Sequence, residues 1–366
     1  MLAVSGCSLR AGVRSSHVPA ASDVETTIYL IGDAGAPAAD REPVLEALES
    51  DAASANNTSV IVFLGDNIYP RGMPLADDPG RAEAERRLSV QVEAVLTSGA
   101  RGIFIPGNHD WDFWGNDGGR ETVERAVQFG ESIGGERVDF APAAACPGPQ
   151  TMDIDRHVRL VMIDTQWWLF DEPVETPATC PATTMEQVLD SLRRAITSAG
   201  GRHVIVAGHH PMTTGGPHGG YFSPMQHVFP LRELYEWAWI PLPVIGSLYP
   251  LARRLGISEQ DVFNDRYQAM NEALEAVFLE KPPLAYASGH EHSMQLLVGV
   301  GARYQLVSGG GTWGHRTPVA PKDGTLYAAS RSGYMRLQVQ ADGRVRLGVI
   351  FVDEDGTRRE AFSAYL

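Results

Sequence analysis

The chain has 366 residues, of which 43% are hydrophobic and 20% are charged. This balance allows a sizeable core and excludes wholesale disorder. Thirty basic and 45 acidic residues give a net charge of −15, which argues against a nucleic-acid coat and against electrostatic docking to anionic lipid. An anionic substrate would therefore need local attraction, for example from bound metal cations.

The N-terminal residues 1–25 are predicted to be a lipoprotein-like signal remnant and tether, followed by one domain over residues 26–366. Val4-Ser5-Gly6 before Cys7 resembles the lipobox of bacterial lipoproteins, in which the cysteine is lipidated. The usual charged start and long apolar stretch are missing, so either the true start codon lies upstream or the match arises by chance. The pattern predicts an extracytoplasmic, lipid-anchored protein attached to the membrane through Cys7.

Two further cysteines, Cys146 and Cys180, lie in the Pro-rich sequences ACPGP and TCPAT. Such positions favour a disulfide that joins two loops in an oxidising compartment. The alternative interpretation is a pair of unrelated thiols.

Short apolar runs alternate with segments of helical spacing from residue 26 onward. Strands are predicted, in chain order, at 27–31, 60–64, 103–106, 158–163, 203–207 and 284–288. Helices are predicted between them at 41–54, 81–97, 120–133 and 185–199. This alternation is typical of βαβ units and an α/β sheet. After residue 302 the pattern changes to alternating strands, which predict a second sheet packed on the first.

The segment 221–265 interrupts this rhythm with an apolar insertion. Its part 221–256 is aromatic, Pro-broken and apolar. Three interpretations remain open: a lid over the site, a surface that rests on a membrane or partner, and an ordinary packed insertion.

Polar motifs follow five of the predicted strands: GDAG at 32–35, GDNIY at 65–69, GNHD at 107–110, GHHP at 208–211 and GHEH at 289–292. Sites in open α/β sheets lie beyond the carboxyl ends of strands, so these motifs should converge. Carboxylate, amide and imidazole ligands together suit Zn, Fe and Mn. The set is too large for one tetrahedral metal and fits two metals. Taken singly, the Asp and Asn residues could instead cap helices or turns.

The five motifs in this order resemble those of calcineurin-like metallophosphoesterases, over roughly residues 26–315. The first motif lacks the histidine of the DxH pattern in protein Ser/Thr phosphatases. Tyr69 follows Asp66 as in the GDxxY motif of purple acid phosphatases, and His218 lies nine residues after His209. The chain looks most like their small, tartrate-resistant type. The resemblance implies a metallophosphoesterase-type four-layer α-β-β-α sandwich with two packed mixed β-sheets.

The resemblance also implies roles for the site residues. One metal ion would be held by Asp33, Asp66, Tyr69 and His292. The other would be held by Asp66, Asn108, His209 and His290. The pair implied is Fe(III) with Fe, Zn or Mn, and a metal-bound hydroxide would be the nucleophile. Catalytic roles fall to His109 and His218, which would bind phosphate oxygens and protonate the leaving alkoxide, and to Asp110, which would orient His109.

Several of these assignments have open alternatives. Tyr69 could be a core aromatic, and His210 could replace its neighbour His209 as a ligand. His218 could be a solvated loop residue, and His315 could line the cleft. The 81 residues from His209 to His290 exceed the spacing expected for the small purple acid phosphatases.

The function expected is hydrolysis of phosphate monoesters. One alternative is a phosphodiesterase of the same superfamily that acts on nucleotides, lipids or cell-wall phosphates. A more remote alternative is a cell-surface binding module that kept the fold without turnover. The sequence gives no oligomeric state.

Overall fold

The computed structural model describes residues 9–10, 19–20, 23–55, 57–112, 119–170, 174–233 and 238–366. Its α-helices are α1 Pro43–Ala53, α2 Arg81–Ser98, α3 Arg120–Gly134, α4 Met185–Thr197, α5 Pro224–Val228, α6 Leu248–Arg254 and α7 Asp265–Glu280. None of the described helices is long and apolar enough to cross a membrane. Cys7 lies outside the described residues, as does most of the tether.

Among the described residues, two mixed sheets form the centre of the fold. One sheet has the order β1 Leu9–Arg10, β12 Thr325–Ala329, β10 Met294–Val298, β11 Tyr304–Ser308, β9 Ala285–Ser288, β8 His203–Ala207, β7 Val158–Met162 and β6 Gln150–Asp153. The other has the order β15 Arg358–Tyr365, β14 Val345–Val352, β13 Gly333–Gln340, β2 Val24–Ile31, β3 Thr58–Leu64, β4 Arg101–Ile105 and β5 Val138–Phe140.

The C-terminal strands do not form a sheet of their own, which corrects the sequence-based prediction. Strand β13 pairs antiparallel with β2, with Leu337 opposite Ile28. Strands β10, β11 and β12 instead extend the sheet of β7, β8 and β9. Two packed sheets are therefore present as predicted, but the C-terminal strands are divided between them.

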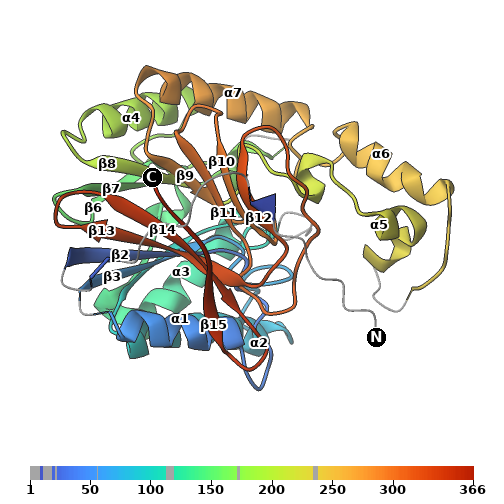
Figure 1. Cartoon of the computed structure of the whole chain (residues 1–366), viewed down its shortest axis with the longest axis horizontal. Helices are drawn as coiled ribbons and strands as arrows, with labels where there is room; N and C mark the ends of the chain where they lie inside the picture. Colours follow the sequence, from blue (N-terminus) through green and yellow to red (C-terminus); the bar gives the residue numbers. More distant parts are fainter. Residues whose placement is uncertain are drawn as a thin grey trace.

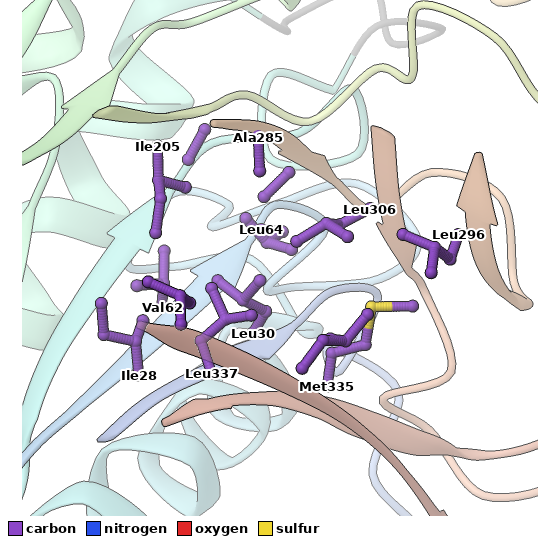
Figure 2. Close-up of a cluster of buried hydrophobic side chains, with 14 of the residues drawn as sticks. Ile28, Leu30, Val62, Leu64, Ile205, Ala285, Leu296, Leu306, Met335 and Leu337 are labelled. Carbon is purple, nitrogen blue, oxygen red and sulfur yellow. The ribbon is translucent and has the colours of Figure 1, made fainter. Parts of the chain in front are cut away.

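The two sheets lie face to face, with helices on both outer sides (Figure 1). Helices α4 and α7 cover the sheet that contains β8, while α1 and α2 cover the sheet that contains β2. Figure 2 shows apolar side chains of both sheets meeting in the middle, among them Leu30, Ile205 and Leu306. The arrangement is a four-layer α-β-β-α sandwich, as expected from the sequence.

The pattern of β2 shows why its residues form a central strand. Ile28 and Leu30 point into the layer between the sheets, and Tyr29 and Ile31 pack under the helices. Alternate side chains of a strand face opposite sides of its sheet, so a strand buried on both faces needs an uninterrupted apolar run. The sequence TIYLI meets this requirement.

A disulfide joins Cys146 and Cys180, which confirms the predicted pairing. It links the loop before β6 to the loop before α4.

The insertion 221–265 stands to one side of the sandwich, with α5 and α6 at its outer end (Figure 1). Several of its apolar side chains are exposed. Val244 is 85% exposed, Leu255 72% and Ile257 70%. The outer part of the insertion is therefore largely in solvent, whereas its inner end, where Gln260 and Asp261 are each 1% exposed, is packed.

Candidate metal centre

The candidate site lies where the carboxyl ends of strands from both sheets meet. The loops after β2, β3 and β4 belong to one sheet, and those after β8 and β9 belong to the other. A backbone hydrogen bond joins the two sheets at this point, because Gly32 N donates to the Ser308 carbonyl at 2.8 Å. These loops carry, in chain order, Asp33, Asp66, Asn108, His209, His290 and His292.

The backbone is tightly constrained where these side chains converge. Gly65 adopts a φ of +91°, and a Cβ there would lie 2.4 Å from Nδ1 of His209. A Cβ at Gly107 would lie 2.3 Å from Oδ1 of Asp66. Asp33 and Asp66 themselves adopt positive φ angles of 60° and 56°. Such strain costs about 1 kcal/mol or more per residue and is concentrated at functional sites.

A first cluster of side chains surrounds the phenol oxygen of Tyr69. This oxygen lies 3.1 Å from Oδ1 of Asp33 and 3.0 Å from Oδ2 of Asp66. It also lies 3.0 Å from Nε2 of His292. The phenol therefore meets three polar side chains, which is not the environment of a core aromatic.

A second cluster forms around the amide oxygen of Asn108. This oxygen lies 3.0 Å from Nε2 of His209 and 3.1 Å from Nδ1 of His290. The two imidazole nitrogens are 3.3 Å apart. The other nitrogen of His209, Nδ1, donates to the Leu64 carbonyl at 2.8 Å, so Nε2 is the nitrogen that faces the cluster.

Asp66 connects the two clusters through a single oxygen atom. Its Oδ2 lies 3.0 Å from the Tyr69 phenol oxygen and 3.4 Å from Nε2 of His209. Asp33, Asp66 and His209 each offer one ligand atom within 4.8 Å of the others.

The electrostatics of the centre show that it is short of positive charge. Burial alone would raise the pKa of Asp66, but His209 and His109 lower it. Burial alone would lower the pKa of His209, but the negative charge of Asp66 and Asp33 raises it to about 9. Burial and the same two carboxylates raise the pKa of Tyr69 well above 10. Protonated His209 thus supplies the positive charge that a bound cation would otherwise provide to balance the carboxylates.

These observations fit a pair of metal ions. Oδ2 of Asp33 is buried and has no hydrogen-bond partner among the described residues. Such an orphaned carboxylate oxygen is costly unless a ligand completes it. The donor set combines carboxylate, phenol, amide and imidazole groups, which suits Fe, Zn and Mn.

His109 and His218 lie at the rim, one beside each cluster. The His109 ring is 4.3 Å from the Tyr69 ring, its Nδ1 is 2.7 Å from the Pro70 carbonyl, and its Nε2 is 4.0 Å from Oδ2 of Asp66. The His218 ring is 3.9 Å from the ring of His290. Both side chains are 21% exposed, so they remain accessible to a substrate.

Asp110 lies beneath the turns that carry two of the candidate ligands. Its carboxylate accepts hydrogen bonds from the backbone N–H groups of Asn67, Ile68 and Gly107 at 2.8–3.1 Å. The His109 imidazole bonds instead to the Pro70 carbonyl. Asp110 therefore stabilises the turns that carry Asp66 and Asn108.

Two other histidines lie against the centre. His210 has both ring nitrogens engaged, with Nδ1 2.8 Å from the Thr165 hydroxyl and Nε2 2.8 Å from Oε1 of Gln260. These bonds favour His209 as the ligand. His315 lies with its ring 4.0 Å from that of His292 and 5.5 Å from that of Tyr69. The structure thus brings His315 to the edge of the first cluster.

Three residues at the centre were missed by the sequence analysis. The Gln260 carbonyl accepts a hydrogen bond from Nε2 of His290 at 2.9 Å, and Asp261 contacts His218. Both belong to the insertion, where no motif marks them. Glu291 is fully buried and accepts a hydrogen bond from His218 N at 3.1 Å. Its place between His290 and His292 was a signal that could have been used.

Comparison with known proteins identifies the family. A family model described as calcineurin-like phosphoesterase matches residues 26–294. The chain belongs to this family. Membership in the calcineurin-like phosphoesterases supports hydrolysis of phosphate esters and implies a dinuclear metal centre. A search of curated protein sequences gave no significant match.

Several solved structures share the fold. GAP50, described as the anchor in the inner membrane complex of Plasmodium, is 15% identical with a TM-score of 0.55; the match covers 94% of this chain and 89% of that one. Purple acid phosphatase PPD1 from yellow lupin (Lupinus luteus) seeds is 13% identical with a TM-score of 0.55, over 92% of this chain and 53% of that one. PhoD is 11% identical with a TM-score of 0.53, and the match covers 94% of this chain and 68% of that one. At these identities the likeness shows the fold alone.

Proposed function

We propose that the protein is a dinuclear-metal-dependent hydrolase of phosphate monoesters, similar to purple acid phosphatases. The observation that carries the proposal is the position of Asp66 Oδ2, 3.0 Å from the Tyr69 oxygen and 3.4 Å from Nε2 of His209. One oxygen between two ligand clusters is what a bridging carboxylate requires. Two bound cations would supply a hydroxide nucleophile at neutral pH and offset the charge of the phosphate.

Each cluster is assigned one metal ion, with Asp66 shared. Asp33, Tyr69 and His292 complete the first ligand set. Asn108, His209 and His290 complete the second. The phenol oxygen is a hard ligand that suits Fe(III), and the nitrogen-rich second set suits Fe, Zn or Mn.

His109 and His218 are proposed to bind the phosphate oxygens and to protonate the leaving alkoxide. The Pro70 carbonyl accepts from Nδ1 of His109, and the Gln260 carbonyl accepts from Nδ1 of His218. In both rings Nε2 is the nitrogen that we assign to contact the substrate. An imidazole ring can both accept and donate a proton, which suits this role.

The experiment that tests this function compares an aryl phosphate monoester with the matching bis-aryl diester. We expect monoester turnover by the wild type and its loss in Asn108→Ala, which controls for contaminating phosphatases. Preference for the diester would reassign the protein as a phosphodiesterase. Turnover of neither ester by protein that holds two metals would contradict the proposal and favour a non-catalytic binding module.

The identity of the first metal is tested by colour. If Tyr69 binds Fe(III) through its phenolate, the purified protein should absorb visible light through ligand-to-metal charge transfer. Tyr69→Phe should remove this band, because phenylalanine has no oxygen to bind the metal. A colourless and fully active wild type would instead point to Zn or Mn, with Tyr69 in a structural role.

We further propose that the protein works outside the cytoplasm, anchored by lipid at Cys7. The Cys146–Cys180 disulfide supports an oxidising compartment. Metabolic labelling with a fatty-acid analogue should mark the wild type and leave Cys7→Ser unmarked. Equal labelling of both proteins, or of neither, would contradict lipidation at this residue.

A further inference from the structure

The insertion reaches the centre through a chain of side chains that ends at His218. Arg253, at the end of α6, donates two parallel hydrogen bonds to the Asp261 carboxylate, from Nε to Oδ2 and from Nη2 to Oδ1. Oδ1 of Asp261 lies 3.0 Å from Nδ1 of His218. Asp261 is 1% exposed, so its charge is shielded from water and relies on these two partners.

The hydrogen bonds around Nδ1 determine which nitrogen of His218 carries the proton. Two acceptors face Nδ1, the Gln260 carbonyl at 2.9 Å and Oδ1 of Asp261 at 3.0 Å. Nη2 of Arg253 is 3.1 Å from the same nitrogen, but it donates to Asp261. The ring therefore donates from Nδ1, and Nε2 becomes the nitrogen presented to a substrate.

The same segment also sets the spacing between His218 and the second cluster. The Gln260 carbonyl accepts from Nδ1 of His218 and from Nε2 of His290, both at 2.9 Å. The two rings consequently lie against each other, 3.9 Å apart. One peptide group of the insertion thus holds a rim histidine beside a proposed metal ligand.

We propose that Asp261, braced by Arg253, is the positioning residue that holds the His218 ring ready to protonate the leaving group. This inference rests on the phosphatase function proposed above. The inference gives the insertion a function. Its inner end supports His218, one of the two rim histidines, while its outer part is exposed. In the step itself, the oxygen of a water-derived nucleophile bonds to phosphorus as the phosphorus–oxygen bond to the leaving group breaks. The departing oxygen takes the Nε2 proton of the doubly protonated His218 ring, which is left in its neutral Nδ1–H form.

The test uses two monoesters whose leaving groups differ in basicity. An alkoxide needs a proton to depart, whereas a nitrophenolate leaves without one. We expect Asp261→Ala to lower kcat for an alkyl phosphate about 100-fold, the lower end of what a general acid contributes. The loss with 4-nitrophenyl phosphate should stay below about threefold. Equal losses with both esters would show a merely structural role and overturn the proposal.

Two further variants guard against misfolding and local charge effects. Asp261→Asn keeps the shape and one acceptor oxygen, so it should recover part of the activity toward the alkyl ester. Glu259→Gln removes a neighbouring carboxylate that makes no hydrogen bond to His218 within the described part of the chain, so both rates should stay at the wild-type level. A matching loss in Glu259→Gln would contradict the assignment to Asp261.

A second readout does not depend on turnover. The ¹⁵N shifts of the His218 ring, recorded on the full-length protein after chelation, distinguish the Nδ1–H from the Nε2–H form. We expect the Nδ1–H form in the wild type and a mixture in Asp261→Ala. Identical spectra would overturn the positioning role even in an active enzyme. If the two proteins differ in this way but the wild type turns over no ester, the positioning role stands and the proposed phosphatase function is wrong.

Discussion

The strand-end loops and the insertion 221–265 meet at the same centre, but they are held in opposite ways. Asp33 and Asp66 are 1% and 2% exposed, and backbone hydrogen bonds tie their loops to both sheets. The insertion leaves Val244 and Leu255 largely in solvent. Its link to the centre runs through the short segment that contains Gln260 and Asp261.

The two regions differ because metal ligands must be positioned more precisely than a segment that only supports them. A metal ligand must be fixed to within a few tenths of an ångström, which the sheets achieve by cross-strand bonding and burial. The insertion needs precision only where it contacts His218 and His290. The rest of it can change sequence without moving the ligands, and the predictions below test this contrast.

The largest effect is expected from Asp66→Ala. Loss of the shared carboxylate should lower the content of bound metal and reduce kcat by about 10³-fold, equivalent to the several kcal/mol that a metal centre contributes to the transition state. Elemental analysis and a phosphatase assay provide the measurements, with Asp40→Ala, at an exposed aspartate, as the matched control. Unchanged activity in Asp66→Ala would rule out a bridging role.

Chelation should destabilise the loops more than the insertion. A ligand present at 100 times its dissociation constant stabilises the folded state by about 2.7 kcal/mol, so removal of the metals should lower the free energy of unfolding by at least a similar amount. Hydrogen exchange should rise at 32–36, 65–70 and 107–110 and stay constant in α6. An equal rise of hydrogen exchange in the strand-end loops and in α6 would show that the two regions are not held differently.

Removal of the disulfide should cost about 2–4 kcal/mol of stability. The bond between Cys146 and Cys180 spans 34 residues, and loss of such a cross-link releases entropy in the unfolded chain. Denaturant unfolding of Cys146→Ser, beside Cys180→Ser, measures the effect. The two variants should agree, and a large difference between them would show that one cysteine contributes by packing alone.

The smallest effect is expected on the outer face of the insertion. Leu255→Ala should change stability by less than about 0.5 kcal/mol, because the side chain is 72% exposed. Leu274→Ala, at a fully buried position of α7, should cost about 2–5 kcal/mol. Thermal unfolding compares the two, and similar losses would mean that the insertion is packed more firmly in solution.

The sequence predicted the first half of the fold well because each central strand is a short apolar run. The motif residues could be found because each follows such a run directly, as Asp66 follows VIVFL. Helix α7 was missed although Tyr267, Met270, Leu274 and Phe278 recur on one buried face. That spacing is typical of an amphipathic helix and was available in the sequence.

Other features had no local signal. The pairing of β13 with β2 joins segments about 300 residues apart, and strand periodicity does not specify a partner. The contact of Asp261 with His218 spans 43 residues and depends on how the insertion folds back. Alternation of apolar residues identifies a strand and its faces, whereas sheet membership is decided by tertiary packing.

The place of β13 also has a consequence for folding. Strand β2 lies between β3 and β13, so one of its edges stays open until residues 333–340 have joined the sheet. An unpaired, strongly apolar edge is a template for pairing with other chains. The newly made protein therefore depends on its last strands, or on a chaperone that covers this edge, to escape aggregation before the metal centre can assemble.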